Sequence, residues 1–292
     1  MRYVDTLENF FVLDKNALRS SNATKAKSVI DSANMGALVI DTTFIEQIRT
    51  GKFVDQCEKD LRDWDDKPDR MSISRGVGEL MREELCSGKR AVTVVDNLMT
   101  RDIRILLSGS AQKKMIQLQA VEPNAIIKTA RLRKPGGRLD AAFYIELFKN
   151  RLDYWYKCYL PAIRESIRSE VEDKAVPPVP LVKIGTLVYS DRVIDLLKND
   201  LAATGFSREN AEALLTTPSF TGMHYYTMEA YAIMLWAQGV RLDRVNLEER
   251  LNELFDLDYV AYGLCCRGLQ TYEPLMGRLE QGLRLAFEKR WP

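Results

Sequence analysis

Acidic residues follow three short apolar runs of this sequence. Asp14 directly follows the first run, Glu46 lies in the helix expected after the second, and Glu273 comes just after the third. Asp256 and Asp258 lie at the start of the helix that precedes the third run. Open parallel sheets bind their ligands outside the carboxyl ends of the strands. If the three runs are neighbouring parallel strands, these acids converge at one edge of a sheet.

Crowded carboxylates repel each other and take up protons unless a cation neutralises them. Hard divalent cations such as Mg²⁺ prefer oxygen ligands and keep several bound waters. One such water can be activated to attack phosphorus while the metal stabilises the charge on the phosphate. The chain has a single histidine, His224, so a mechanism that needs two histidines is excluded within one subunit. We therefore expect Mg²⁺ or Mn²⁺ as cofactor and phosphodiester hydrolysis as the reaction.

The N-terminal part of the chain alternates between strand and helix patterns. Phe10–Leu13 and Ala37–Ile40 are apolar runs typical of buried strands, and Ser21–Ser32 has apolar residues at helical spacing. Thr43 and Glu46 have the spacing of a capping box, which predicts a second helix. Alternating strands and helices predict an α/β fold with a parallel sheet flanked by helices.

The middle of the chain predicts mostly helices. Leu139–Val171 has the spacing of one long helix, while the β-branched run Ala91–Val95 predicts a further strand that ends at another acid, Asp96. The charge-rich segment Lys59–Arg70 is interpreted as a loop or a solvated helix. The aromatic segment Phe220–Tyr231 is interpreted as helix core, with base stacking as the alternative. Other helices are expected over 191–203, 207–215, 221–239, 247–255, 259–264 and 274–289, and a short strand over 268–271.

Three blocks of the sequence resemble the hallmark segments of the PIN-domain nucleases. They read FVLDKNAL, GALVIDTTFIEQIR and DLDYVAYGLCCRGLQTYEPLM, in that order. The resemblance implies a parallel sheet flanked by helices, with acids that bind Mg²⁺ or Mn²⁺ and hydrolyse RNA or, less often, DNA. By match to the family pattern, the first to fourth acidic places fall on Asp14, Glu46, Asp256 and Glu273. The hydroxyl residue often found before the fourth acid is Thr271.

The resemblance also implies the organisation and activity of the chain. Residues 1–60 and 245–292 would form a PIN-like nuclease core, and 61–244 a mostly helical insertion that covers the nucleic-acid groove or adds core strands. We expect an endoribonuclease, of a family that includes toxins and phage-defence effectors held in check by a protein partner. A catalytically silent PIN-like scaffold that binds RNA or protein is the alternative. The expected metal ligands are Asp14, Glu46 and either Asp256 or Asp258, with Glu273 as a supporting acid.

Each acid also has an ordinary structural explanation. Asp14 could cap a helix, and Glu46 could be a solvated residue on an amphipathic helix. Asp256 and Asp258 could stabilise the dipole at the start of a helix. Glu273 stands where an ordinary helix could begin. The sequence alone leaves these alternatives open.

The composition is that of a folded chain with balanced charge. Hydrophobic residues make up 46% and charged residues 28%, and Lys plus Arg total 42 against 41 Asp plus Glu. Any surface that binds phosphates must therefore be local. The basic stretch 128–138 offers one, with a solvated loop as the alternative, and its candidate contacts are Lys128, Arg131, Arg133 and Lys134. We expect RNA as partner in preference to DNA and leave self-association open.

Cysteine usage and hydropathy predict a cytoplasmic protein. The chain has five cysteines without C-x-x-C spacing, which indicates neither a disulfide framework nor a structural zinc site. The N-terminal residues lack the pattern of a secretion signal. No uncharged apolar run approaches the ~18 residues that a membrane span needs.

Overall fold

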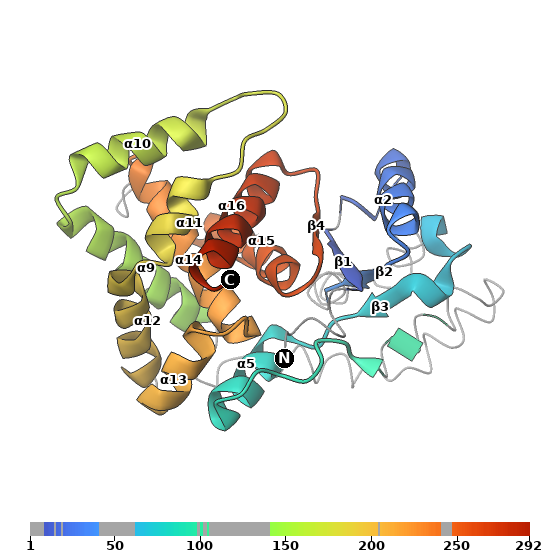
Figure 1. Cartoon of the computed structure of the whole chain (residues 1–292), viewed down its shortest axis with the longest axis horizontal. Helices are drawn as coiled ribbons and strands as arrows, with labels where there is room; N and C mark the ends of the chain where they lie inside the picture. Colours follow the sequence, from blue (N-terminus) through green and yellow to red (C-terminus); the bar gives the residue numbers. More distant parts are fainter. Residues whose placement is uncertain are drawn as a thin grey trace.

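The computed structural model combines a small parallel sheet with a larger body of helices (Figure 1). The structure describes residues 9–14, 16–18, 20–40, 62–97, 100, 101, 104, 141–203, 205–240 and 247–292. None of the helices in these ranges is long and apolar enough to cross a membrane.

The four strands form one sheet in the order β3-β2-β1-β4. They are β1 (Phe10–Leu13), β2 (Gly36–Val39), β3 (Met71–Ile73) and β4 (Gly268–Gln270). Every pairing is parallel, and Leu13 at the end of β1 lies opposite Val39 on one side and Gln270 on the other. All four carboxyl ends therefore meet at one edge of the sheet. The α/β class and the strands predicted near residues 10, 37 and 268 are confirmed.

Side chains of the strands alternate between two apolar cores. Leu13 and Val39 pack with α2 (Ser20–Ser32) in the smaller core. Val12 and Leu38 belong to the larger core, on the opposite face of the sheet. Successive residues of a strand point to opposite faces, so covering both faces requires strands that are apolar throughout. This explains why the two central strands, β1 and β2, are continuous apolar runs rather than alternating ones.

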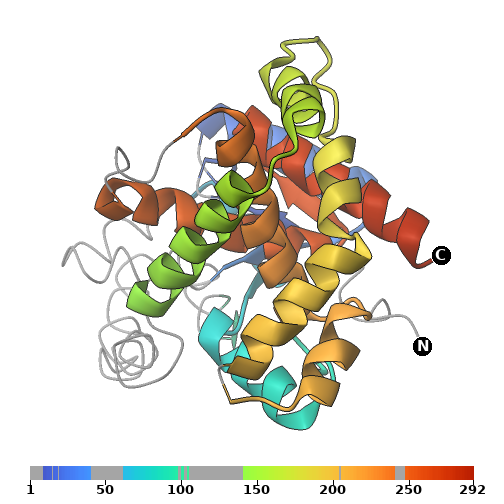
Figure 2. The same ribbon diagram turned by 90° about the vertical axis from the view of Figure 1, so that its left-hand side faces the viewer.

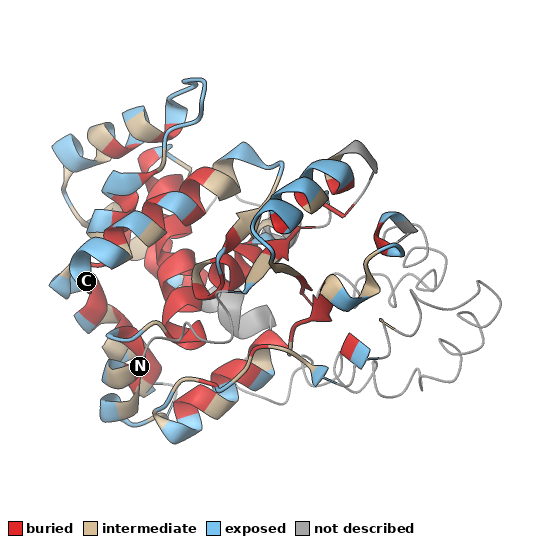
Figure 3. Cartoon of the chain, turned by 45° about the vertical axis from the view of Figure 1, so that its right-hand side comes forward, coloured by how far each residue is buried: buried red, intermediate tan, exposed pale blue. Residues whose placement is uncertain are grey.

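The larger core is built by helices from the middle and the end of the chain. These are α5 (Val77–Ser87), α9 (Ala141–Lys157), α10 (Pro161–Glu172), α11 (Val182–Val188), α12 (Asp191–Ala203), α13 (Arg208–Leu215), α14 (Phe220–Ala237), α15 (Leu247–Cys265) and α16 (Pro274–Arg290). They surround α14, which contacts α5, α9, α10, α11, α13 and α15 (Figure 2). Every residue of α14 is buried, and Figure 3 shows the buried residues concentrated in this part of the molecule. The aromatic segment 220–231 is therefore helix core rather than a stacking surface.

Two helix predictions need correction. The long helix expected over 139–171 is divided into α9 and α10, because Pro161 opens a new helix at a position where proline is well tolerated. The separate helices expected over 247–255 and 259–264 form the single helix α15. Its buried residues Leu257, Tyr259 and Val260 continue the apolar face across the expected gap.

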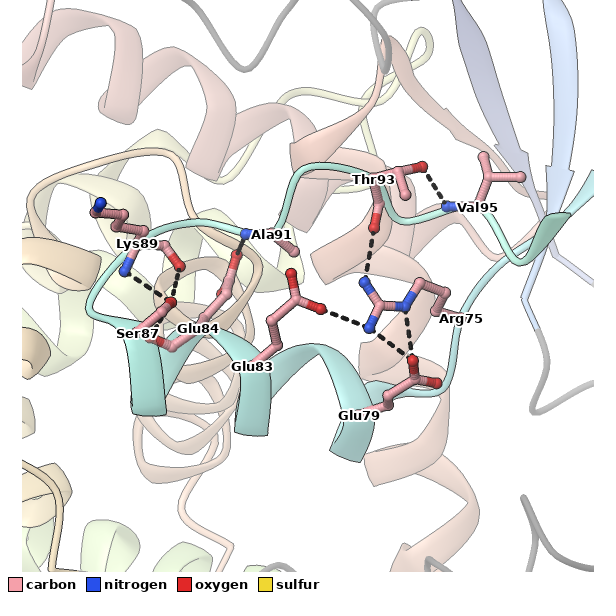
Figure 4. Close-up of polar contacts among 9 residues, drawn as sticks. All are labelled: Arg75, Glu79, Glu83, Glu84, Ser87, Lys89, Ala91, Thr93 and Val95. Atoms are coloured by element: carbon pink, nitrogen blue, oxygen red, sulfur yellow. Dashed lines mark hydrogen bonds and ion pairs between the residues drawn. The ribbon is translucent and has the colours of Figure 1, made fainter.

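The β-branched run 91–95 is not a strand, so that prediction was wrong. It forms a single antiparallel bridge, between Val95 and Ser74. Two backbone hydrogen bonds join the run to the end of β3: Arg75 N donates to the Val94 carbonyl at 2.7 Å, and Asp96 N donates to the Ile73 carbonyl at 2.8 Å. Side chains from the region of α5 also hold its backbone, as Figure 4 shows: Arg75 Nη1 donates to the Thr93 carbonyl at 3.3 Å, and Glu84 Oε1 accepts from Ala91 N at 2.9 Å. The run is therefore held by one bridge at the end of β3 together with polar side chains, and not by a continuous ladder. The strand that completes the sheet is β3, which the sequence analysis did not predict.

Glu84 also joins α5 to the first turn of α14. Its side chain is fully buried, and besides Ala91 it accepts hydrogen bonds from Phe220 N at 3.1 Å and Thr221 N at 2.7 Å. The first N–H groups of a helix have no acceptor within the helix. A carboxylate of one helix therefore caps another, which fixes α14 relative to the segment that leads out of β3.

Candidate functional site at the carboxyl edge of the sheet

Asp14 stands directly after β1, at the carboxyl edge of the sheet. Its N–H donates to the Gln270 carbonyl at 3.2 Å and so continues the pairing of β1 with β4. Its Oδ1 accepts from Ala17 N at 2.6 Å, a local turn that aspartate favours. The residue is 7% exposed. The carboxylate is thus held in one orientation at the end of a central strand.

Thr271 fixes the second oxygen of this carboxylate. It follows β4, and its hydroxyl donates a hydrogen bond to Asp14 Oδ2. The same hydroxyl oxygen accepts from Glu273 N at 3.0 Å. A hydroxyl has one proton to donate, so the direction of this small network is determined. The two ends of the described chain meet here through Asp14 and Thr271.

The donor chemistry of this pair fits a hard cation. An ionised carboxylate has about four acceptor positions, and Asp14 uses one on each oxygen for the bonds to Ala17 and Thr271. Carboxylate and hydroxyl oxygens are the ligands that Mg²⁺ and Mn²⁺ prefer. Two effects raise the pKa of Tyr272 above its usual value: burial is the larger one, and the negative charge of Asp14 is the second.

Glu273 enters the network through its backbone. It is the N-cap residue of α16, but its side chain accepts no capping hydrogen bond. The residue is exposed. Its carboxylate is therefore available to solvent beside the Thr271–Asp14 pair, and the helix start is accounted for by Pro274 rather than by a cap.

Asp256 and Asp258 lie on different faces of α15, as expected for residues two apart on a helix. Asp256 is exposed, whereas Asp258 is 5% exposed. Asp258 Oδ1 lies 3.4 Å from Nδ1 of His224 on α14. The buried acid of the pair is thus engaged with the helical body.

Several predicted residues lie outside the described part of the chain. They are Glu46 and the four basic residues Lys128, Arg131, Arg133 and Lys134. Within the described ranges, no group of three or more His, Cys, Asp or Glu side chains is placed to hold a metal ion. Of the predicted residues, the structure brings together Asp14, Thr271 and the backbone of Glu273.

Asp96 is a further acid at the carboxyl edge, for which the sequence offers no motif. Its N–H donates to the Ile73 carbonyl at 2.8 Å, at the end of β3. β3 is two strands away from β1 and Asp96 pairs with the outer side of β3, so three spacings of about 4.8 Å, roughly 14 Å in all, separate Asp96 from Asp14 along the edge. Its place after a β-branched run was the signal, and that run is joined to the end of β3 by a single antiparallel bridge.

Comparisons of the chain with protein-family models, with curated proteins and with solved structures found no match in any of the three.

Proposed function

We propose that the protein is a metal-dependent nuclease with a PIN-like fold, and an endoribonuclease in preference to a deoxyribonuclease. The observation that carries this proposal is the hydrogen bond from Thr271 to Asp14, at the carboxyl ends of two adjacent parallel strands. Open α/β sheets bind ligands at this edge. The same two residues occupy the first acidic place and the hydroxyl place of the PIN-domain resemblance.

In the proposed site, Asp14 holds Mg²⁺ or Mn²⁺ together with Glu46 and with Asp256 or Asp258. When bound, such an ion supplies an activated water and stabilises charge on the phosphate and the leaving oxygen. Thr271 positions Asp14, because its donated proton restrains one carboxylate oxygen. The exposed carboxylate of Glu273 is suited to orient water on the solvent side.

The proposed setting is the cytoplasm, where the protein acts as a toxin or phage-defence effector restrained by an inhibitory protein partner. This part rests on the family resemblance. It is supported by the thiols of Cys86, Cys158, Cys265 and Cys266, which are all free and fit a reducing compartment. The residues from 61 to 244 would then be the insertion that shapes the nucleic-acid groove.

A catalytically silent PIN-like scaffold that binds RNA or a protein is the second candidate. The observation that favours it is the burial of Asp258 against His224, which engages one candidate for the third acid with the helical body. The two candidates differ in one property: the scaffold binds its partner without cutting a phosphodiester bond.

The test is cleavage of labelled RNA and DNA by wild type and Asp14→Asn, with Mg²⁺, with Mn²⁺ and with EDTA. Asp195→Asn is the matched control, because Asp195 is an exposed aspartate on α12, far along the chain from the sheet edge. We expect metal-dependent cleavage in wild type and in the control. In Asp14→Asn it should fall at least about 100-fold, beyond the 10- to 100-fold typical of residues that only orient a metal ligand.

Each other result has a clear consequence. Folded wild type that cuts no RNA or DNA with either metal contradicts the nuclease and leaves the scaffold. Equal cleavage by Asp14→Asn contradicts the place of Asp14 in the site. RNA and DNA substrates in parallel reactions decide between the two nucleic acids.

A further inference from the structure

Tyr272 is an exposed aromatic residue directly beside the Asp14 site. It lies between Thr271, which donates to Asp14, and Glu273 at the start of α16. Its side chain is 40% exposed. Its hydroxyl donates to the Asn22 carbonyl on α2 at 3.2 Å. The ring is therefore anchored at its tip while its surface remains accessible.

Lys25 of α2 accompanies this ring. Its Nζ lies over the Tyr272 ring at 5.9 Å from the centroid, within the range of a cation–π contact. Lys25 is also exposed. The connection between β4 and α16 thus passes beside α2 (Figure 1), and an accessible ring and an ammonium group stand together next to an acidic edge.

Accessible rings are uncommon among the described aromatics. Those of α14 are buried, and Tyr189, Trp155 and Trp64 are buried as well. Tyr159, which is 91% exposed, lies between α9 and α10 and so belongs to the helical body rather than to the sheet edge. Tyr272 is the exposed ring that adjoins Asp14.

We propose that Tyr272 and Lys25 form a subsite for one unpaired nucleotide of a single-stranded nucleic acid, with the base stacked on Tyr272 and a phosphate near Lys25. This rests on the proposed function and names its substrate class. Every base has a π-face, so stacking on an aromatic side chain is tolerant of sequence. A base inside a duplex is already stacked and cannot use this ring without leaving the helix. The adjacent phosphodiester is then presented to the Asp14 edge.

The test measures binding without cleavage. Every protein in the test carries Asp14→Asn, and the buffer contains EDTA, so that the nucleic acid is not cleaved. Fluorescence anisotropy measures the binding of three labelled oligonucleotides: a single-stranded RNA, a single-stranded DNA and a duplex. Tyr272→Ala should weaken single-strand binding by about 5- to 150-fold, the range found when a stacked base loses its aromatic partner. Tyr272→Phe, which keeps the ring, should retain most of the affinity. Tyr159→Ala, an equally large change at a remote exposed tyrosine, should bind as the parent does.

Lys25→Ala gives an independent readout. Loss of one phosphate contact on a single strand should reduce the slope of log K against log salt by about 0.7. Each of four results overturns the subsite. They are an unchanged salt slope in Lys25→Ala, an unchanged single-strand affinity in Tyr272→Ala, equal affinity for duplex and single strand, and no binding of either single strand. Cleavage by wild type is measured separately. If wild type cuts nucleic acid and Tyr272→Ala binds single strands as tightly as its parent does, the subsite is refuted and the nuclease is not. If single-strand binding depends on Tyr272 but wild type cleaves neither RNA nor DNA, the nuclease is refuted and the subsite is not.

Discussion

The hydroxyl of Thr271 donates a hydrogen bond to the carboxylate of Asp14, although the two residues are 257 positions apart in the chain. Their strands, β4 and β1, are direct neighbours in the sheet. Segments from opposite ends of the described chain therefore build one polar site, while the helices from α5 to α15 form the helical body between them. The geometry of Asp14 depends on both segments.

Replacing Thr271 tests whether this bond positions Asp14. Thr271→Val is nearly isosteric but removes the donor to Asp14 and the acceptor for Glu273 N. We expect cleavage to fall about 10- to 100-fold, as for residues that orient a metal ligand. Thr271→Ser keeps the hydroxyl and should keep most of the activity. Steady-state cleavage rates decide, and equal rates in the valine and serine variants would contradict a positioning role.

Binding of a divalent cation should stabilise the fold independently of any activity. A ligand at about 100 times its dissociation constant adds about 2.7 kcal/mol to the free energy of unfolding, which corresponds to a rise of roughly 4 °C in the unfolding temperature of a chain of this size. Thermal unfolding with Mg²⁺, Mn²⁺ or EDTA measures this shift. It should appear in wild type and in Asp195→Asn and be lost in Asp14→Asn. A shift that survives in Asp14→Asn would place the cation elsewhere.

The sequence predicted the parts of the fold that depend on local pattern. The strand at 10–13 is an apolar run and that at 268–270 is a short segment around Leu269, and each is followed directly by a polar residue of the site, Asp14 or Thr271. The helices over 191–203 and 208–215 have clear apolar spacing, and Ser207 caps the second by accepting from Asn210 N at 3.0 Å. Local propensity and tertiary packing agree in these elements.

Other parts depend on contacts that no local pattern encodes. β3 has only three residues, Met71–Ile73, and is defined by its pairing with β2. The run at 91–95 has strand propensity, but it makes a single antiparallel bridge to the end of β3, and the side chains of Arg75 and Glu84 bond to the Thr93 carbonyl and to Ala91 N. The burial of Asp258 depends on α14, which is distant in sequence. In each case a long-range partner overrides the local preference.

Glu84 should be a large contributor to stability. Glu84→Ala leaves the N–H groups of Ala91, Phe220 and Thr221 buried without this acceptor, and each such group costs about 1–3 kcal/mol. We expect a loss of about 3 kcal/mol or more in urea unfolding. Glu83→Ala is the neighbouring control: Glu83 is 40% exposed and pairs with Arg75, so its removal should cost about 1 kcal/mol or less (Figure 4). Equal losses in the two variants would contradict the capping role.

The vicinal cysteines should be chemically silent in the folded protein. Burial raises the pKa of Cys266 to about 12 and that of Cys265 well above its usual value, so both stay protonated near neutral pH. The thiolate is the nucleophile in alkylation. At pH 8 a thiol reagent should therefore modify exposed Cys86 well before Cys265 or Cys266, as read by peptide mass spectrometry. Modification of all three at similar rates in native protein would contradict the buried placement of α15.

Helices α11 and α16 pack closely at two glycines, Gly185 and Gly282. A Cβ added at Gly282 would stand 2.5 Å from the Leu181 carbonyl carbon, and one at Gly185 would stand 2.5 Å from the Gly282 carbonyl oxygen. Backbone atoms cannot move aside as a flexible side chain can, so Gly282→Ala should destabilise the protein by about 1–3 kcal/mol despite the better helix propensity of alanine. At Gly78 in α5 nothing lies within 4 Å of the added atom, so Gly78→Ala should be neutral or stabilising by up to about 1 kcal/mol. In urea unfolding, the free energy of unfolding should therefore fall in Gly282→Ala and stay equal or rise in Gly78→Ala. A stabilised Gly282→Ala would mean that α11 and α16 are farther apart than in this structure.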